Sequence, residues 1–364
     1  MHRDRRIVMC IPAGRRGHME ILLQLLTSKH YNTVVDRVQF WMNTLDEADL
    51  AWMHDYKTTK DPNDWVELIR PPKGTVINPR ILWHSVCKFY RYARDADTVY
   101  VKVDDDICAI DTLERFVAFL DFRIDNEEYF LISANVLNNA ILTHYHQRFG
   151  NFKTDRGIVR YDSHDRLGLW DGQFAEYTHE QLLDDELDRF RGNFPRCVIL
   201  QDYERICINW VAWNGEDMAL FAGDVAKEDE LDLTVRKPSS LGRPCAIFGN
   251  FVVVHFSFGP QNKHMARTGY LDMYRCKAFG LPHKLEPRNW DTADISTKTV
   301  ESTIVPEEPI RFLATHSGND ANWRSKKTSV RPTPKSSLII IPRDTLTPVG
   351  DIVLTTPNPS VLVL

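Results

Sequence analysis

The sequence predicts an α/β protein with a central, mostly parallel sheet covered by helices on both faces. Short runs of β-branched and other apolar residues alternate with longer segments whose apolar residues recur at helical spacing. This alternation continues through the first half of the chain, as in strand–helix–strand units. Hydrophobic residues make up 43% of the 364 residues, as in ordinary globular proteins. The length allows one core of about 250–300 residues and a tail.

The first element is a buried strand at Ile7–Ile11, which ends at a turn containing Gly14. A helix is expected from about Gly17 to Ser28. Further along, apolar residues at helical spacing after Pro79, which suits a first helical turn, predict one long amphipathic helix. In order, the elements expected after 28 are a strand at 38–42, a helix at 46–56, a strand at 65–69, the amphipathic helix at 79–94, a strand at 98–103, a helix at 111–122 and a strand at 129–136.

The second half is less regular. Residues 143–196, rich in His, Tyr, Arg and acidic residues, are expected to form a functional insertion. A helix is predicted at 202–213, strands at 245–248 and 251–256, and a last helix at 265–278. Eight of the 19 prolines lie in the last 60 residues, so we expect a domain over 1–290 and a flexible tail over 291–364. The tail's apolar runs at 338–341 and 361–364 are alternatively edge strands or partner contacts.

Composition excludes several classes of protein. A net charge of −5 gives no electrostatic basis for nucleic-acid binding. The seven cysteines are scattered and form no Cys-x-x-Cys pair, which argues against a disulfide framework and a zinc site and favours a reducing compartment. No apolar run approaches the ~20 residues of a membrane span, and no signal peptide is evident. We therefore expect a cytoplasmic protein, with peripheral membrane association left open.

Three consecutive aspartates, Asp104, Asp105 and Asp106, follow the strand Thr98–Val103. Carboxylates that lie so close repel one another unless a cation neutralises them. Divalent ions such as Mg²⁺ and Mn²⁺ prefer oxygen ligands and often link carboxylates to substrate phosphates. The alternative is an acidic helix start capped at Asp111 or Thr112, but capping needs only one such residue.

Two later motifs add to this. Glu216 and Asp217 follow Trp213-Asn-Gly215, where Asp217 is either an active carboxylate or an N-cap. His255 ends an apolar strand and is either a core residue or a ligand of a divalent ion. Lys263 and Arg267 in the following segment are suited to phosphate charge.

An Asp-x-Asp at a strand end, then a Glu-Asp pair, then a strand-terminal histidine resembles the order found in glycosyltransferases of the GT-A fold, over about residues 5–280. The resemblance implies a Rossmann-like α/β/α sandwich with a smaller strand-rich acceptor side. It implies a nucleoside-diphosphate sugar as donor, held through Mn²⁺ or Mg²⁺ by Asp104, Asp106 and His255. Asp104 and Asp105 would also help to hold ribose or sugar.

The resemblance further assigns Asp217, or alternatively Glu216, as the general base of an inverting reaction. An altered spacing after Gly259 leaves retention open. Acceptor recognition is expected at Trp170 and Trp213, because aromatic faces pack on sugar rings. The acceptor class is open among glycans, glycolipids, proteins and small molecules. The residues expected around the donor are Pro12, Ala13, Gly14, Arg15, Arg16, Asn43 with Thr44, Arg80, Asp104, Asp105 and Lys263.

Two rival functions remain at this point. A metal-dependent nucleotidyltransferase or phosphohydrolase also gathers carboxylates at strand ends, but the sequence contains no Walker-type phosphate loop. A non-catalytic sugar-nucleotide or glycan-binding module would keep the fold, although the Glu-Asp pair and His255 are both intact.

Overall fold

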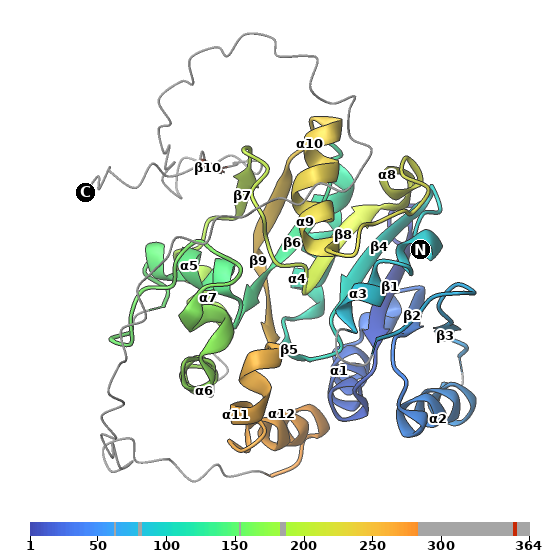
Figure 1. The fold of residues 1–364 in the computed structure, drawn as a ribbon, viewed down its shortest axis with the longest axis horizontal. Coiled ribbons are helices and arrows are strands. Elements are labelled where there is room, and N and C mark those ends of the chain that lie inside the picture. The colour runs from blue at the N-terminus through green and yellow to red at the C-terminus, as the bar shows by residue number, and fades with distance from the viewer. Residues whose placement is uncertain (62, 79–81, 153, 183–186, 283–351, 355–364) are drawn as a thin grey trace, which may run out of the picture. The chain divides into compact units, whose positions relative to one another are not determined.

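The computed structural model describes residues 1–61, 63–78, 82–152, 154–182, 187–282 and 352–354 (Figure 1). All of them belong to one compact unit formed by residues 1–285 and 337–364. The two apolar runs expected as possible edge strands, 338–341 and 361–364, lie outside the described residues. Among the described residues, no helix has the length and apolar character needed to cross a membrane.

The unit is built on one mixed sheet. Nine of its strands follow the order β10-β7-β9-β6-β8-β4-β1-β2-β3, and β5 pairs with β9. The parallel and antiparallel pairings give β1, β2, β3, β4, β6 and β9 one direction and the other described strands the opposite one. The strands are β1 Arg6–Ala13, β2 Arg37–Met42, β3 Val66–Ile69, β4 Thr98–Val103, β5 Ile107–Ile110, β6 Ile132–Leu137, β7 Cys197–Leu200, β8 Trp210–Asn214, β9 Cys245–His255 and β10 Ile352–Leu354.

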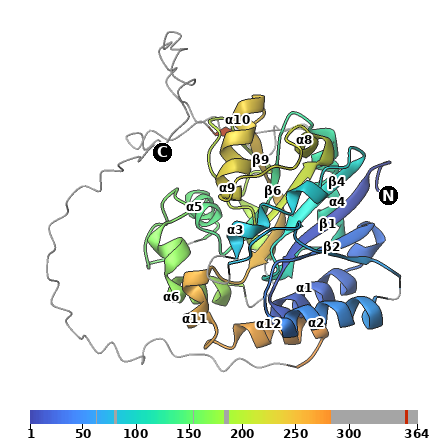
Figure 2. The same cartoon turned by 45° about the vertical axis from the view of Figure 1, so that its right-hand side comes forward.

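Helices cover both faces of the sheet (Figures 1 and 2). On β9, Phe248 packs against the aromatic rings of Phe119 and Phe122 from α4. Neighbouring strand residues face opposite sides, so Cys245 points the other way, and its thiol lies 3.8 Å from the Leu233 carbonyl of η5. The predicted α/β sandwich is confirmed. The α-helices are α1 Arg16–Ser28, α2 Glu47–Asp55, α3 Trp83–Val86, α4 Leu113–Asp125, α5 Ala140–Arg148, α6 Gly172–Glu180, α7 Leu187–Gly192, α8 Gly215–Ala219, α9 Asp229–Leu231, α10 Lys237–Leu241, α11 Asn262–Met265 and α12 Tyr270–Phe279.

Shorter helical turns complete the unit: η1 Tyr31–Thr33, η2 Tyr56–Lys60, η3 Tyr90–Tyr92, η4 Arg166–Trp170, η5 Asp232–Arg236 and η6 Gly259–Gln261. Several sequence predictions differ from this structure, among them the last helix expected at 265–278, which is divided into α11 and α12. The helix expected at 79–94 is broken into α3 and η3. The helix expected at 202–213 is wrong, because residues 202–209 form no helix and 210–213 belong to the strand β8, which pairs with β4 and β6. The two strands expected at 245–256 form the single strand β9.

Strand direction determines where the polar residues meet. The carboxyl ends of β1, β2, β4, β6 and β9 lie along one side of the sheet, which we call the carboxyl edge. In α/β sheets this is where ligands bind. Strand β8 runs the other way: Trp210 pairs with Val103, and Asn214 pairs with Val99. The chain therefore enters β8 at the carboxyl edge and leaves it at the opposite, amino edge.

Candidate active site

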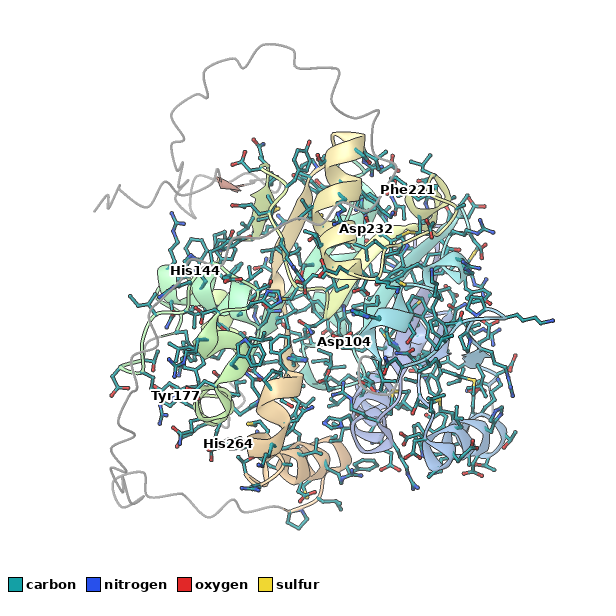
Figure 3. All side chains as sticks on the ribbon, viewed as in Figure 1. Asp104, His144, Tyr177, Phe221, Asp232 and His264 are labelled. Atoms are coloured by element: carbon teal, nitrogen blue, oxygen red, sulfur yellow. The ribbon has the colours of Figure 1, made fainter. Side chains whose placement is uncertain are left out.

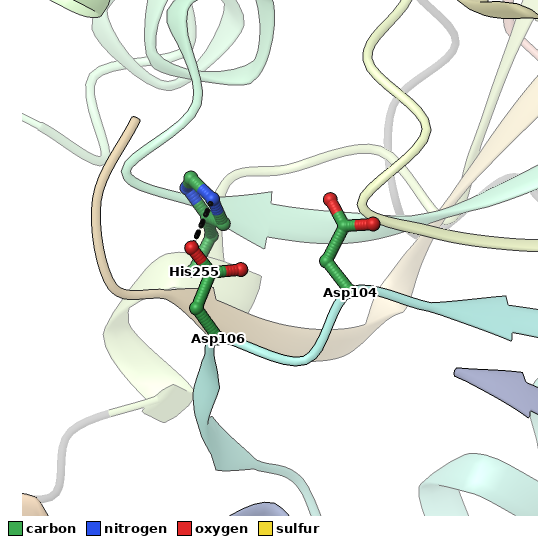
Figure 4. Close-up of side chains that lie close together, drawn as sticks. All are labelled: Asp104, Asp106 and His255. Carbon is green, nitrogen blue, oxygen red and sulfur yellow. Dashed lines mark ion pairs between the residues drawn. The ribbon is translucent and has the colours of Figure 1, made fainter. Parts of the chain in front are cut away.

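Asp104, Asp106 and His255 converge at the carboxyl edge (Figure 4), and Figure 3 marks the position of Asp104 on the fold. Each contributes one possible ligand atom, and these atoms all lie within 4.8 Å of one another. Asp104 directly follows β4, and Asp106 precedes β5, which pairs with β9 so that Ile107 lies opposite His255. Antiparallel pairing of β5 and β9 thus brings together residues about 150 positions apart in the chain. The prediction that these three residues meet is confirmed.

Asp106 is buried between positive groups. Its Oδ2 atom lies 3.2 Å from His255 Nε2 and 3.0 Å from Arg15 Nη1. Its other oxygen, Oδ1, is buried and has no hydrogen-bond partner in the described structure. Burial by itself raises the pKa of Asp106, but the charges of Arg15 and His255 outweigh it and hold that pKa below its usual range. A charged carboxylate with an unpaired oxygen is suited to a cation.

The hydrogen bonding of His255 determines which ring nitrogen faces Asp106. Nδ1 lies 3.1 Å from the carbonyl oxygen of Asn138, which can only accept, so Nδ1 carries a proton. In the neutral ring, Nε2 then points a lone pair at the Asp106 carboxylate. Burial lowers the pKa of His255, but the neighbouring Asp106 raises it further, so the ring favours a second proton. A proton or a metal ion must therefore lie between Nε2 and the acids, and the residues fit a divalent metal.

Asp104 has a different environment. Asn209 donates from Nδ2 to Asp104 Oδ2 at 2.7 Å, and the Lys102 ammonium group pairs with Oδ1. Lys102 also donates to the carbonyl oxygen of Ile208 at 2.9 Å. About a quarter of the Asp104 side chain is exposed, at 24%. Asp104 therefore presents an oriented carboxylate to the open side of the site.

Asp105 connects the acidic segment to the loop after β1. It accepts a hydrogen bond from the backbone N–H of Gly14 at 3.1 Å and another from Arg15 Nε at 3.0 Å. Arg15, predicted to reach phosphate, thus lies in the site and pairs with two of the three acids, while 40% of its side chain remains exposed. Arg16 points elsewhere, because its guanidinium pairs with Glu20 at 2.9 Å.

The remaining donor candidates are placed less directly. Pro12 and Ala13 are the last residues of β1, beside this loop. The Asn43 side chain, which follows β2, donates to the Leu82 carbonyl at 2.9 Å and accepts from Ser85 Oγ at 2.6 Å, so its polar atoms are already paired. Thr44 caps the next turn by accepting from the N–H of Asp46. Lys263 is exposed on α11, and Arg80 lies outside the described residues.

The structure does not bring Glu216 and Asp217 into this site. They lie on α8, which begins at the end of β8 and therefore at the amino edge. Asp217 is buried in an ion pair with Arg243, whose Nη2 also donates to the Tyr129 carbonyl at 3.1 Å. The predicted role of either residue as general base is wrong, because β8 carries the chain away from the metal ligands.

The two predicted acceptor tryptophans have different surroundings. Trp213 is fully buried, stacks on Tyr100 at 5.9 Å and donates from Nε1 to the Ala93 carbonyl at 3.1 Å. It is a core residue, so its assignment to acceptor binding is wrong. Trp170, at the end of η4, is 57% exposed. Gln261 holds the segment before Trp170 by donating to the Gly168 carbonyl at 3.2 Å. Gln261 itself lies six residues after His255 in the sequence.

Sequence reasoning missed Asp229, the first residue of α9. The Tyr90 hydroxyl donates to its Oδ2 at 3.4 Å. Burial raises the pKa of Asp229 to about 7, with the charges of Glu230 and Asp104 adding to the rise and that of Lys102 opposing it. Asp229 is therefore electrostatically coupled to the carboxyl edge. A Glu-Asp pair before a helix also occurs at 228–229, so the signal that pointed to 216–217 was present twice.

His18 is a second residue that the sequence did not reveal. It lies one turn into α1, with its ring edge-on to Phe256 at 5.4 Å. Its Nε2 atom is buried and has no hydrogen-bond partner among the described residues. Burial and the charge of Arg15 lower its pKa, so the ring is neutral beside the acidic site. No periodicity distinguishes such a residue from a core histidine.

Comparison of the sequence with protein families and with curated proteins finds no match. Among solved structures, similar ones include glucosyl-3-phosphoglycerate synthase from Mycobacterium tuberculosis, in complex with Mn²⁺, UDP-glucose and phosphoglyceric acid. It is 12% identical, with 77% of this chain and 82% of that chain covered and a TM-score of 0.38. The galactosyltransferase LgtC, in complex with donor and acceptor sugar analogues, is 14% identical, with 78% and 99% covered and a TM-score of 0.32.

Proposed function

We propose that this protein is a divalent-metal-dependent glycosyltransferase that moves a sugar from a nucleoside-diphosphate sugar to an acceptor hydroxyl. The observation that carries the proposal is the convergence of Asp104, Asp106 and His255, whose possible ligand atoms lie within 4.8 Å of one another and include a buried carboxylate with one unpartnered oxygen among the described residues. Two carboxylates and one imidazole suit Mn²⁺ or Mg²⁺. When bound, such an ion would stabilise the negative charge that grows on the departing diphosphate.

The loop after β1 supports donor binding. The backbone N–H of Gly14 and the guanidinium of Arg15 are both held by Asp105. With a divalent ion balancing the acids, Arg15 would be able to turn its exposed end towards phosphate oxygens, for which guanidinium has the right geometry. The side chain is anchored at the metal site and partly open to solvent, as this movement requires.

Asp229 replaces Asp217 as the carboxylate that we propose to take the acceptor proton. It lies near the carboxyl edge, is half-buried, and is held by Tyr90 on one oxygen. The raised pKa of about 7 gives its carboxylate more basicity than an exposed aspartate has. A carboxylate that takes the proton of the acceptor hydroxyl allows that hydroxyl to attack directly, opposite the leaving diphosphate. We therefore propose inversion at the anomeric carbon.

A thermal denaturation screen of nucleoside-diphosphate sugars, with and without Mn²⁺, tests the proposal. We expect at least one donor to raise the melting temperature only when Mn²⁺ is present, since ligands that bind the folded state stabilise it. Asp106→Asn should abolish this shift, and Asp155→Asn, an exposed site with the same chemical change, should keep it. A metal-independent shift, or none with any donor at millimolar concentration, would contradict the proposal.

Transfer activity separates a transferase from a binding module. With the stabilising donor, Asp229→Asn should keep the Mn²⁺-dependent shift and lose turnover. If the wild-type protein binds donor yet transfers sugar neither to water nor to any acceptor, the rival non-catalytic reading is correct.

A further inference from the structure

A basic cavity lies beside the candidate active site. It has a volume of about 450 Å³ and is lined by the loop after β3, by residues of the α3–η3 segment and by Lys227. Its wall contains four cationic side chains and no aspartate or glutamate. The four are Lys73, Lys88, Arg91 and Lys227.

The charges of this cavity are not balanced within the described structure. None of the four cations forms an ion pair among the described residues. This contrasts with Arg15 and Lys102 at the metal site, which both pair with aspartates. Cations gathered around one hollow repel each other and raise the local potential, so an anion entering it gains interactions with several of them at once.

The position of the cavity relates it to the reaction. Lys227 is two residues before Asp229, the proposed base. Ser85 lines the cavity and also donates to Asn43 at the carboxyl end of β2. The cavity thus adjoins the carboxyl edge, but its wall contains none of the three proposed metal ligands and not Arg15. A ligand there would be held separately from the donor diphosphate.

We infer that the cavity is a subsite for an anionic group, of the phosphate class, on the acceptor. A hydroxyl of that acceptor would then be placed near Asp229. The assignment of the anionic group to an acceptor rests on the proposed transferase function, whereas the anion subsite itself does not. An acceptor without an anionic group would leave the four cations unpaired and would bind more weakly.

Inorganic phosphate is the probe for the subsite. In EDTA no metal ion can hold phosphate at the metal site, so calorimetric titration with phosphate, compared between the wild type and the cavity variants, reports on the cavity. We expect the double variant Lys88→Gln/Lys227→Gln to bind phosphate about tenfold more weakly or worse, since it loses two charged donors. The control Lys60→Gln/Arg115→Gln removes the same net charge at exposed positions and should bind like the wild type. No phosphate binding by the wild type, or equal loss in both variants, would overturn the inference.

Two further measurements separate this inference from the proposed function. The double variant should keep the Mn²⁺-dependent stabilisation by donor, whereas Asp106→Asn should lose that stabilisation and keep phosphate binding. Uridine or guanosine diphosphate with Mn²⁺ should not displace phosphate. Displacement would assign the cavity to the donor and refute the acceptor subsite. Glucose 6-phosphate should compete with phosphate, and equal competition by glucose would show that the anionic group is not what the cavity recognises.

Discussion

At the scale of single residues, the site depends on the direction of one imidazole ring. The Asn138 carbonyl fixes the proton of His255 on Nδ1, so Nε2 faces Asp106. A hydrogen bond from the other ring nitrogen to a backbone carbonyl orients metal-binding histidines in this way and fixes their tautomer. Asp106 adds a buried oxygen without a hydrogen-bond partner among the described residues, and Asp104 adds a carboxylate oriented by Asn209 and Lys102.

Replacing the imidazole should therefore weaken metal binding without unfolding the protein. We expect His255→Gln to raise the Mn²⁺ dissociation constant by about tenfold or more, as loss of a ligand nitrogen usually does. Titration of Mn²⁺ followed by electron paramagnetic resonance measures this directly. His146→Gln is the matched control, because His146 is equally buried but bonds Asn135 away from the acids. Equal Mn²⁺ affinity in the wild type and His255→Gln would remove the histidine from the ligand set.

Asp229 makes a separate prediction about pH. Its folded-state pKa, about 7, lies above the usual value of 3.8, so the folded state binds more protons than the unfolded state between those pH values. Its contribution to stability is therefore full below pH 3.8 and is lost as the pH rises through 7. Asp229→Asn removes this penalty and should stabilise the inactive variant by about 1 kcal/mol at pH 8, allowing for solvent screening, but not at pH 4. Urea denaturation at both pH values measures the difference.

At the scale of elements, the strand β8 is where the structure differs most from the sequence prediction. It is inserted antiparallel beside β4 and moves α8 to the amino edge. There the chain approaches itself closely: a Cβ atom at Gly215 would lie 2.0 Å from the carbonyl oxygen of Asp95. Glycine is needed at this position for packing, and the Glu-Asp pair that follows belongs to a structural turn.

Asp217 should accordingly behave as a structural residue. Replacing one partner of a buried ion pair leaves the other unpaired, so Asp217→Asn should destabilise the fold by about 3 kcal/mol. The variant should keep its Mn²⁺-dependent donor binding and turnover at temperatures where it is folded. Denaturant unfolding and activity at 15 °C distinguish the two effects. Loss of turnover in a fully folded variant would restore Asp217 to the active site.

The sequence predicted most elements because their patterns are local. Alternating valines predicted β4, and the helices expected at 17–28 and 111–122 correspond to α1 and α4. Residues 202–213 were misassigned because β8 is defined by its partners in the sheet, not by its own periodicity. Their positions at strand ends identified Asp106 and His255 from the sequence. The sequence did not show which of the two Glu-Asp pairs lies at the carboxyl edge. That depends on strand direction, which a single sequence does not encode locally.

At the scale of the whole molecule, the acids of the site are balanced from within. Arg15 comes from the loop after β1, Lys102 from β4 and His255 from β9, so three separate segments each supply a positive group. The sheet can therefore bring three carboxylates to one edge without depending on an external ion to fold.

Removal of metal should consequently leave the fold intact. We expect EDTA to lower the melting temperature of the wild-type protein by only a few degrees, because Arg15 and protonated His255 compensate Asp105 and Asp106. Arg15→Ala should make the protein sensitive to EDTA, with a larger drop that Mn²⁺ restores. Arg16→Ala, one residue along and outside the site, is the control. Cooperative unfolding of the wild type on chelation would show that the metal is structural.

A proton and a metal ion would compete for the same atom, Nε2 of His255. Because the raised pKa of His255 favours a proton on this nitrogen, binding of a metal ion there would release that proton to the solvent. Occupancy of the site by metal would therefore fall as the pH is lowered, even at a constant metal concentration. Calorimetry in buffers of differing ionisation enthalpy would count the hydrogens released and, through them, show how strongly cellular pH governs this protein.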